Sequence, residues 1–194
     1  LSHLRPFWHD DIGKWADSTH FGAEGRFHVD HPETNIRFGG GLDDVWENSE
    51  SGELHIVDYK STAQLGKESK PLDESFISAP EDPSEPDYKA GYRRQMDMYQ
   101  WITRRLGFDV SDTGYFVYVD GQHRNEQGML DGDSPTQAWM RFNVSVIPYE
   151  GNDSWVEDAL RRAKYLVSKV SDCLRHTLDS EHGQYLANVL EVMS

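Results

Sequence analysis

Two aspartates and a lysine are the residues of this sequence best suited to do chemistry together. Asp43 follows three glycines and a leucine, and Asp58 and Lys60 lie further on in Ile-Val-Asp-Tyr-Lys. Side chains at alternate positions of a strand share one face, so Asp58 and Lys60 should lie side by side. A carboxylate buried among apolar neighbours, as Asp58 would be, needs an ion pair, hydrogen bonds or a metal.

The chemistry that these groups favour is metal-dependent hydrolysis. Two carboxylates held side by side repel each other unless a proton or a cation lies between them. A hard divalent cation with oxygen ligands meets that need, which implies Mg²⁺ or Mn²⁺. Such a metal would polarise a phosphoryl oxygen and lower the pKa of a bound water. Lys60 could orient that water or stabilise charge on the phosphate, so the set suits cleavage of a phosphodiester.

Three motifs in this order resemble one enzyme superfamily. They are Gly-x-Leu-Asp ending at Asp43, Val-Asp-Tyr-Lys at residues 57–60 after a hairpin, and Gln-x-x-x-Tyr from Gln95 to Tyr99 on the following helix. Together they are similar to the PD-(D/E)XK nuclease superfamily, and in particular to its RecB-like exonuclease branch. The resemblance covers residues 39–107, and the strand and helix that follow fit the order of the family's core.

The resemblance implies a role for each matching residue. The two aspartates would be metal ligands, with the carbonyl of Tyr59 as a third, and Lys60 would be the catalytic lysine. Gln95 and Tyr99 would help to position the substrate strand, and their spacing places them on one helical face. The predicted catalytic residues are therefore Asp43, Asp58, Lys60, Gln95 and Tyr99, and the predicted metal ligands are Asp43, Asp58 and Tyr59.

Two positions of the family's pattern stay open. Asp44 competes with Asp43 for the first ligand position, and the apolar residue that the family has before its aspartate favours Asp43. The family also supplies a His or Glu from a helix upstream of the first strand. His9, His20 and Glu24 are candidates for that residue, or it lies outside this chain.

The strands and helices that would position these groups follow from the periodicity of the apolar residues. We expect strands from residue 25 and at 36–46, 53–60, 114–119 and 140–148, turns at 31–35 and 48–52, and helices around 10–17 and at 88–106. A Ser-x-x-Glu capping box at Ser154 predicts the start of a final helix. Its expected buried stripe consists of Val156, Ala159, Leu160, Ala163, Leu166, Val167, Val170, Cys173 and Leu174.

This order of strands and helices predicts an α/β or α+β fold. We expect a mixed central β-sheet flanked by helices, and the resemblance implies a restriction-endonuclease-like core. With 194 residues, the chain is expected to form a single domain over 1–194. Residues 63–87 are rich in proline, serine and acidic residues and lack periodicity, which predicts a mobile insertion that is either functional or an inert spacer.

The composition limits the possible partners and compartments. Lys and Arg number 19 against 34 Asp and Glu, a formal net charge of −15, so phosphate is repelled unless cations reverse the field locally. The single cysteine, Cys173, excludes an internal disulfide framework and a four-cysteine zinc or iron–sulfur site. No apolar run is long enough to cross a membrane, and a reducing, cytoplasmic location is expected.

Basic and aromatic residues near the motifs could hold a nucleic acid. Four arginines on the glutamine-bearing helix would either contact phosphates or form a solvated helix flank. Lysines in or beside the insertion could close over a substrate strand, and two tryptophans could stack a base or simply pack. These residues are Arg93, Arg94, Arg104 and Arg105, then Lys67, Lys70 and Lys89, and finally Trp101 and Trp139.

These features lead to one expected function and two alternatives. We expect a Mg²⁺- or Mn²⁺-dependent deoxyribonuclease that hydrolyses DNA phosphodiesters, as an exonuclease or in processing single-stranded or duplex ends. The first alternative is a catalytically weak or inactive module on the same fold that binds nucleic acid or a protein, which the net charge favours. The second is a metal-binding protein that acts on a small phosphorylated ligand.

Overall fold

The computed structural model describes residues 1–17, 19, 23–63, 72–122, 130–131, 134–169 and 184. The chain forms two compact units, Leu1–Val156 and Glu157–Ser194. The first unit holds the main sheet and the three motifs, and the second holds most of the last helix. A single nuclease-like domain over residues 1–194 stays a prediction.

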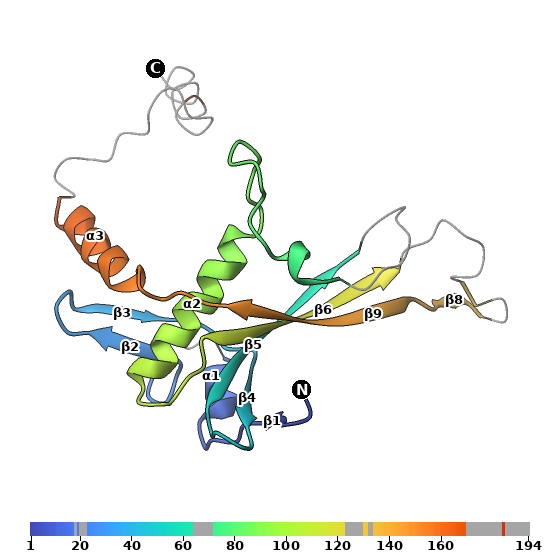
Figure 1. Cartoon of the computed structure of the whole chain (residues 1–194), viewed down its shortest axis with the longest axis horizontal. Coiled ribbons are helices and arrows are strands. Elements are labelled where there is room, and N and C mark those ends of the chain that lie inside the picture. Colours follow the sequence, from blue (N-terminus) through green and yellow to red (C-terminus); the bar gives the residue numbers. More distant parts are fainter. Residues whose placement is uncertain are drawn as a thin grey trace. The chain divides into compact units, whose positions relative to one another are not determined.

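A mixed five-stranded β-sheet organises the first unit (Figure 1). In spatial order its strands are β1 (Leu4–Pro6), β4 (Asp44–Asn48), β5 (Leu54–Thr62), β6 (Thr113–Gln122) and β9 (Arg141–Glu150). β5 and β6 run parallel, and the other neighbouring pairs are antiparallel. The first five residues of β5 are all buried, and three of them (Leu54, Ile56 and Val57) are apolar, as expected of a central strand. The predicted mixed α/β class and its mixed sheet are confirmed.

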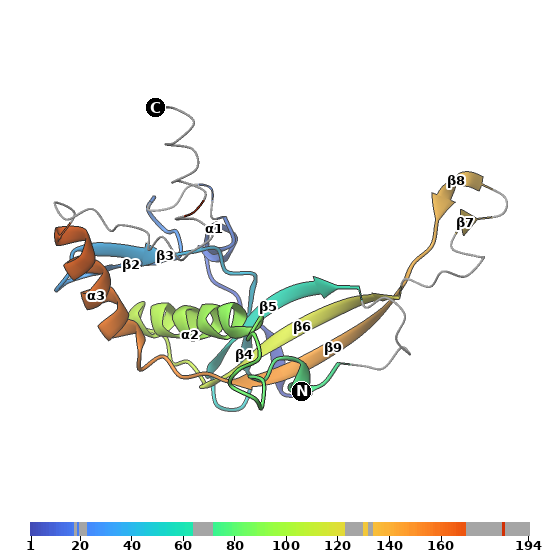
Figure 2. The ribbon, with the colours of Figure 1, turned by 90° about the horizontal axis from the view of Figure 1, so that it is seen from above.

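The helix α2 (Ala90–Arg105) connects the parallel strands β5 and β6 and lies along one face of the sheet (Figure 2). Its apolar residues recur at three- and four-residue spacing, and Met96 and Tyr99 are buried on the inward face. A Cβ at Gly114 of β6 would lie 2.5 Å from the Met96 sulfur, so this glycine allows helix and sheet to approach closely. The helix predicted at 88–106 is confirmed.

Smaller elements complete the first unit. Two hairpins form separate two-stranded sheets, and the first turns at Asn35, whose φ is 56°, a left-handed conformation that asparagine tolerates. The turn expected at 48–52 closes with Gly52 N–H donating to the Asn48 carbonyl at 2.8 Å. The elements are α1 (Ile12–Trp15), β2 (His28–His31) paired with β3 (Ile36–Gly39), η2 (Glu74–Phe76), and β7 (Leu130–Asp131) paired with β8 (Ser134–Ala138).

The single strand predicted at 36–46 is wrong. β3 ends at Gly39, and β4 begins at Asp44 in a different sheet. A Cβ at Gly39 would lie 2.2 Å from the carbonyl oxygen of Phe27, and the Gly40 N–H donates to that oxygen at 3.0 Å. The glycines thus let the chain pass close to a neighbouring backbone and leave the first sheet, which an alternating apolar pattern does not reveal.

The later part of the expected insertion, residues 72–87, is attached to the main sheet. The Leu72 N–H donates to Ser145 Oγ of β9 at 2.9 Å. The Phe76 ring packs edge-on against Tyr118 of β6, with ring centroids 5.0 Å apart. Most of the earlier part of the insertion lies outside the described residues, so the mobility expected there stays a prediction.

The last helix, α3 (Val156–Ser168), begins just after the predicted capping serine. The stripe expected to be buried is so at its first positions, Val156 and Leu160. It is exposed at Ala163, Leu166 and Val167, because periodicity shows which residues share a face but not whether anything covers it. Positions 170, 173 and 174 lie outside the described residues. In the part of the chain that the structure describes, no helix has both the length and the apolar character to cross a bilayer.

Candidate active site

The face of β5 that α2 covers carries the two residues expected to lie side by side. Asp58 is 2% exposed, and the Nζ atom of Lys60 forms an ion pair with its Oδ2 atom. Lys60 Nζ also donates to the Gln95 Oε1 atom of α2 at 3.5 Å. Strand alternation predicted that Asp58 and Lys60 meet, and the structure confirms this contact.

The carboxylate of Asp43 reaches β5 from the residue just before the start of β4. Because β4 begins at Asp44, which pairs with Val57, the next residues of β5 extend past it. Asp43 fills that place, since its Oδ2 accepts the Tyr59 N–H at 2.9 Å. The N–H and C=O of one strand residue point to the same edge, so the Tyr59 carbonyl lies on the Asp43 side as well.

The charge of Asp43 acts on the buried Asp58. Burial raises the pKa of Asp58 above its usual range, the contact with Lys60 opposes this rise, and the charge of Asp43 adds to it. The second oxygen of Asp58, Oδ1, is buried and has no hydrogen-bond partner among the described residues. A buried carboxylate oxygen without a partner is costly, so the position beside it suits a cation.

The available ligands fit a hard divalent cation. The carboxylates of Asp43 and Asp58 and the carbonyl of Tyr59 offer only oxygen, which Mg²⁺ and Mn²⁺ prefer. Mg²⁺ commonly takes one or two carboxylates and completes its shell with water and substrate phosphate. No three His, Cys, Asp or Glu side chains gather as a metal site within the described residues, so any further ligand must be water, substrate or a residue outside them.

Gln95 connects the lysine to Tyr99. Its Nε2 donates to the Tyr99 hydroxyl oxygen at 2.9 Å, one turn further along α2. Burial raises the pKa of Tyr99, and the charges of Asp58 and Asp43 add to the rise, so the hydroxyl stays protonated and can donate in turn. A Cβ at Gly40 would lie 3.0 Å from that hydroxyl, so the glycine makes room for the tyrosine.

Asp44 lies on the other face of the sheet and has a structural role. Its Oδ1 accepts the N–H of Val45 at 2.8 Å, and its Oδ2 accepts the Trp46 indole N–H at 3.1 Å and the Tyr59 hydroxyl at 2.8 Å. Burial raises the pKa of Tyr59 to about 12, and the hydrogen bond from its hydroxyl to Asp44 adds to the rise. Of the two competing aspartates, Asp43 is the one whose carboxylate accepts a hydrogen bond from the β5 backbone, at Tyr59 next to Asp58.

The upstream ligand that the family's pattern requires is not found among the described candidates. The ring of His9 stacks on Trp15 with centroids 4.9 Å apart, and its Nδ1 accepts the Asp11 N–H at 3.1 Å. Glu24 is exposed, and His20 lies outside the described residues. Neither His9 nor Glu24 joins the two aspartates in a group of potential metal ligands.

Two of the four α2 arginines bind the protein itself. Arg93 pairs with Asp87 and donates to the Ile77 carbonyl at 2.7 Å. Arg104 pairs with Asp153 at 2.6 Å and with Asp112 at 2.5 Å. Both arginines therefore hold loops against α2, a third outcome beside the phosphate contact and the solvated flank considered from the sequence. Arg94 is exposed, and the guanidinium of Arg105 lies 5.1 Å from the Trp101 ring centroid.

The structural role of Asp97 was not predicted from the sequence. Asp97, within the Gln-x-x-x-Tyr motif, is buried and accepts hydrogen bonds from the Tyr149 hydroxyl at 3.1 Å, the Asn152 N–H at 3.0 Å and the Trp155 indole at 2.9 Å. It fastens α2 to the chain at and after the end of β9. The only signal in the sequence is an acidic residue among the apolar residues of a helix.

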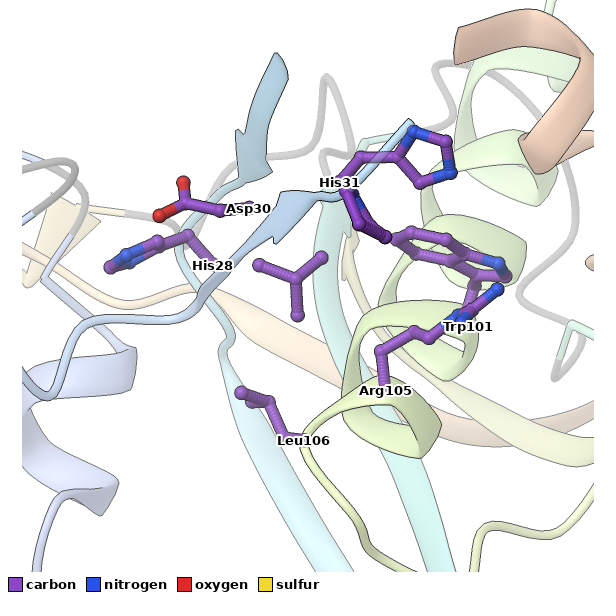
Figure 3. Close-up of a pocket in the computed structure, with 8 residues that line it drawn as sticks. His28, Asp30, His31, Trp101, Arg105 and Leu106 are labelled. Atoms are coloured by element: carbon purple, nitrogen blue, oxygen red, sulfur yellow. The ribbon is translucent and has the colours of Figure 1, made fainter. Parts of the chain in front are cut away.

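A separate cavity of about 460 Å³ lies between β2 and the last turns of α2 (Figure 3). Trp101, Arg105 and His31 are among the residues that line it. None of the predicted catalytic residues contributes to it, and Trp101 itself is buried, which supports packing as its role. Trp139, by contrast, is 71% exposed.

The structure thus brings all the predicted catalytic residues to one place, between β5, the start of β4 and α2. The contacts run from Asp43 through the Tyr59 backbone to Asp58, then to Lys60, Gln95 and Tyr99. No family model matches the chain, and no curated protein matches it. The resemblance to the PD-(D/E)XK nucleases therefore rests on these residues and their arrangement.

Proposed function

We propose that this protein is a metal-dependent nuclease that hydrolyses DNA phosphodiester bonds, as an exonuclease or in processing single-stranded or duplex ends. The proposal includes a restriction-endonuclease-like core of the RecB-like branch, with β4, β5, α2 and β6 as its centre. The observation that carries it is the contact network of one buried aspartate, one lysine and one glutamine, with a second aspartate at the strand edge.

In this proposal Asp43, Asp58 and the Tyr59 carbonyl hold Mg²⁺ or Mn²⁺. When bound, the metal polarises the phosphoryl oxygen and lowers the pKa of a water. Lys60 would donate a hydrogen bond to the attacking water or to a phosphate oxygen. Its position is set by Gln95 on one side and Asp58 on the other.

Gln95 and Tyr99 act as positioning residues for the substrate strand. The protonated Tyr99 hydroxyl accepts from Gln95 and keeps its own proton to donate. A phosphate or sugar oxygen that accepts a hydrogen bond from this hydroxyl would be held near the two aspartates, whose charges raise the pKa of Tyr99. Such positioning lowers the barrier by holding reacting groups in register.

The test of this function is cleavage of end-labelled DNA with added Mg²⁺ or Mn²⁺. We expect degradation that requires the metal and that falls at least about 100-fold in Asp58→Ala and in Lys60→Ala. Asp30→Ala is the matched control, because Asp30 is an exposed aspartate that pairs with Arg37 at 2.7 Å outside the site. Equal rates in the two site variants and the unchanged chain would eliminate the proposal.

A non-catalytic binding module on the same fold is the second candidate. It is favoured by the lack of a third side-chain ligand among the described residues and by the net charge of −15. This candidate predicts measurable DNA or protein binding with no cleavage in either metal. Metal-dependent cleavage by the unchanged chain would exclude it.

A further inference from the structure

A second lysine, Lys89, lies near the candidate site and has an unusual environment. It stands directly before α2, and its Nζ lies 4.1 Å from the ring centroid of Phe76, 5.3 Å from that of Tyr92 and 5.4 Å from that of Tyr118. Three aromatic rings thus surround one ammonium group. Within the described residues, no carboxylate pairs with Lys89, so its charge is not neutralised by an acidic side chain there.

The ring of Tyr92 connects this lysine to the catalytic lysine. The Nζ atom of Lys60 lies 5.1 Å from the Tyr92 ring centroid, close to the 5.3 Å at which Lys89 approaches the same ring. Aromatic faces attract ammonium groups without using up their N–H donors on acceptor atoms. Lys89 is therefore held in place near Lys60 with its hydrogen-bonding capacity still to be satisfied.

Tyr118, whose ring centroid lies 5.4 Å from Lys89 Nζ, supplies a second unsatisfied donor through its hydroxyl. Tyr118 pairs with Lys60 across β5 and β6, is 1% exposed, and its hydroxyl has no hydrogen-bond partner among the described residues. Burial raises its pKa to about 12, and the charges of Tyr92 and Asp58 add to the rise, so it keeps its proton. A buried hydroxyl without a partner is costly and calls for an acceptor.

Charge decides which acceptor fits. Two aspartates and two lysines balance near the site before any metal binds, and a divalent cation would leave the place positive. Lys89 also lines a hollow of about 480 Å³, to which neither Lys60 nor Tyr118 contributes. Its acidic lining residue Asp87 is paired with Arg93, whereas Glu81 is not paired within the described residues. An anion with several acceptor oxygens, such as a phosphate group, would satisfy both the ammonium and the hydroxyl.

We propose that Lys89 and the Tyr118 hydroxyl bind a non-bridging oxygen of the phosphate next to the scissile one in the nucleic-acid strand. This inference rests on the proposed nuclease function, and it makes the two residues a subsite that sets the position of the strand. Neither residue belongs to the three motifs that suggested the function. The subsite contributes to substrate binding, while Lys60 acts on the scissile phosphate.

The first experiment measures binding of a fluorescently labelled single-stranded DNA in Mg²⁺ by the full chain carrying Lys60→Met, in which cleavage is expected to be lost while Asp43 and Asp58 stay in place to hold the metal. Adding Lys89→Met should weaken binding roughly tenfold and reduce the salt dependence of log K by about 0.7, the contribution of one phosphate contact to a single strand. Lys89→Arg should restore both values. Lys164→Met, which removes an exposed lysine of α3, is the control and should change binding less than twofold.

Tyr118→Phe tests the second donor without disturbing the core. Removing only the hydroxyl should weaken binding severalfold and leave the salt dependence unchanged, because no charge is lost. Melting curves of both variants report whether the fold is intact. Lys89→Met and Lys164→Met with equal affinities and equal salt dependence would overturn the subsite, and so would a Tyr118→Phe chain that binds as tightly as its parent.

Steady-state cleavage separates this inference from the function on which it rests. If the unchanged chain cuts DNA, Lys89→Met should raise KM about tenfold with kcat nearly unchanged, whereas Lys60→Met should lower kcat. An active Lys89→Met chain with an unchanged KM contradicts the subsite and leaves the nuclease standing. If the unchanged chain cuts no DNA in either metal, the nuclease proposal fails, and the binding measurements alone decide whether Lys89 contacts phosphate.

Discussion

At the scale of single residues, the site is defined by the conflict between burial and charge at Asp58. The side chain is almost fully buried, lies near the charge of a second aspartate and has an oxygen without a partner among the described residues. Lys60 relieves only part of this cost, since the pKa of Asp58 is still raised. Such a residue lowers stability unless a ligand uses it, which is common at functional sites.

Asp58→Asn should therefore stabilise the metal-free protein at neutral pH. Because the folded pKa of Asp58 is raised, the folded state binds its proton more tightly than the unfolded state. Stability is then lost as the pH rises from the unfolded value, about 3.9, through the folded one. In EDTA at pH 7–8 we expect the variant to melt a few degrees higher, since 1 kcal/mol is roughly 2–4 °C for this size, with no difference at about pH 3.5.

The control for this measurement is Asp30→Asn. Arg37 lowers the pKa of Asp30, first through their hydrogen bond, so the same substitution there should lower the melting temperature at neutral pH. Opposite signs at the two positions would show that burial and Asp43, not the substitution itself, set the result. An Asp58→Asn protein that melts below its parent at pH 7–8 contradicts this reading.

At the scale of elements, the site depends on a few close approaches between backbones and side chains. α2 can bring Gln95 and Tyr99 to β5 because Gly114 lets it pack closely and because Gly40 leaves space for Tyr99. Asp97 fastens the same helix to the chain at and after the end of β9. These contacts position the side chains that the proposed chemistry uses.

Gly40→Ala should reduce cleavage more than it reduces stability. The new Cβ would lie 3.0 Å from the ring and hydroxyl of Tyr99, so the tyrosine must shift and its bond from Gln95 must lengthen. We expect kcat to fall about tenfold, measured by steady-state cleavage of labelled DNA beside a melting curve.

Gly91→Ala is the matched control for that variant. A Cβ there meets nothing within 4 Å in the first turn of α2, so alanine should stabilise the helix by roughly 0.5–1 kcal/mol and leave cleavage unchanged. If Gly40→Ala cuts as fast as the Gly91→Ala control, Tyr99 has no positioning role.

Local pattern predicted the elements that carry the site but not the contacts between distant ones. Alternation along β5 was enough to place Asp58 beside Lys60, and helical periodicity was enough to place Gln95 above them. The break after Gly39, the buried Asp97 and the rings around Lys89 all depend on neighbours far away in the sequence. Periodicity describes one element at a time, so it could not show them.

At the scale of the whole molecule, the net charge of the chain repels a nucleic acid, whereas the candidate site would attract it. A chain with a formal net charge of −15 repels phosphate at long range. Binding must then rely on a local region of positive potential. Two lysines and a divalent cation beside Asp43 and Asp58 would provide such a region. The proposed function thus depends on that cation for attraction as well as for chemistry.

Anomalous scattering from Mn²⁺ in crystals of the protein tests this account most directly. We predict a peak between the carboxylates of Asp43 and Asp58, within roughly 2.1–2.3 Å of an oxygen from each, with Lys60 moved away from Asp58. The peak should be absent from Asp58→Asn crystals grown in the same solution. A Mn²⁺-soaked crystal with no peak there, and with Lys60 still paired to Asp58, would contradict the account.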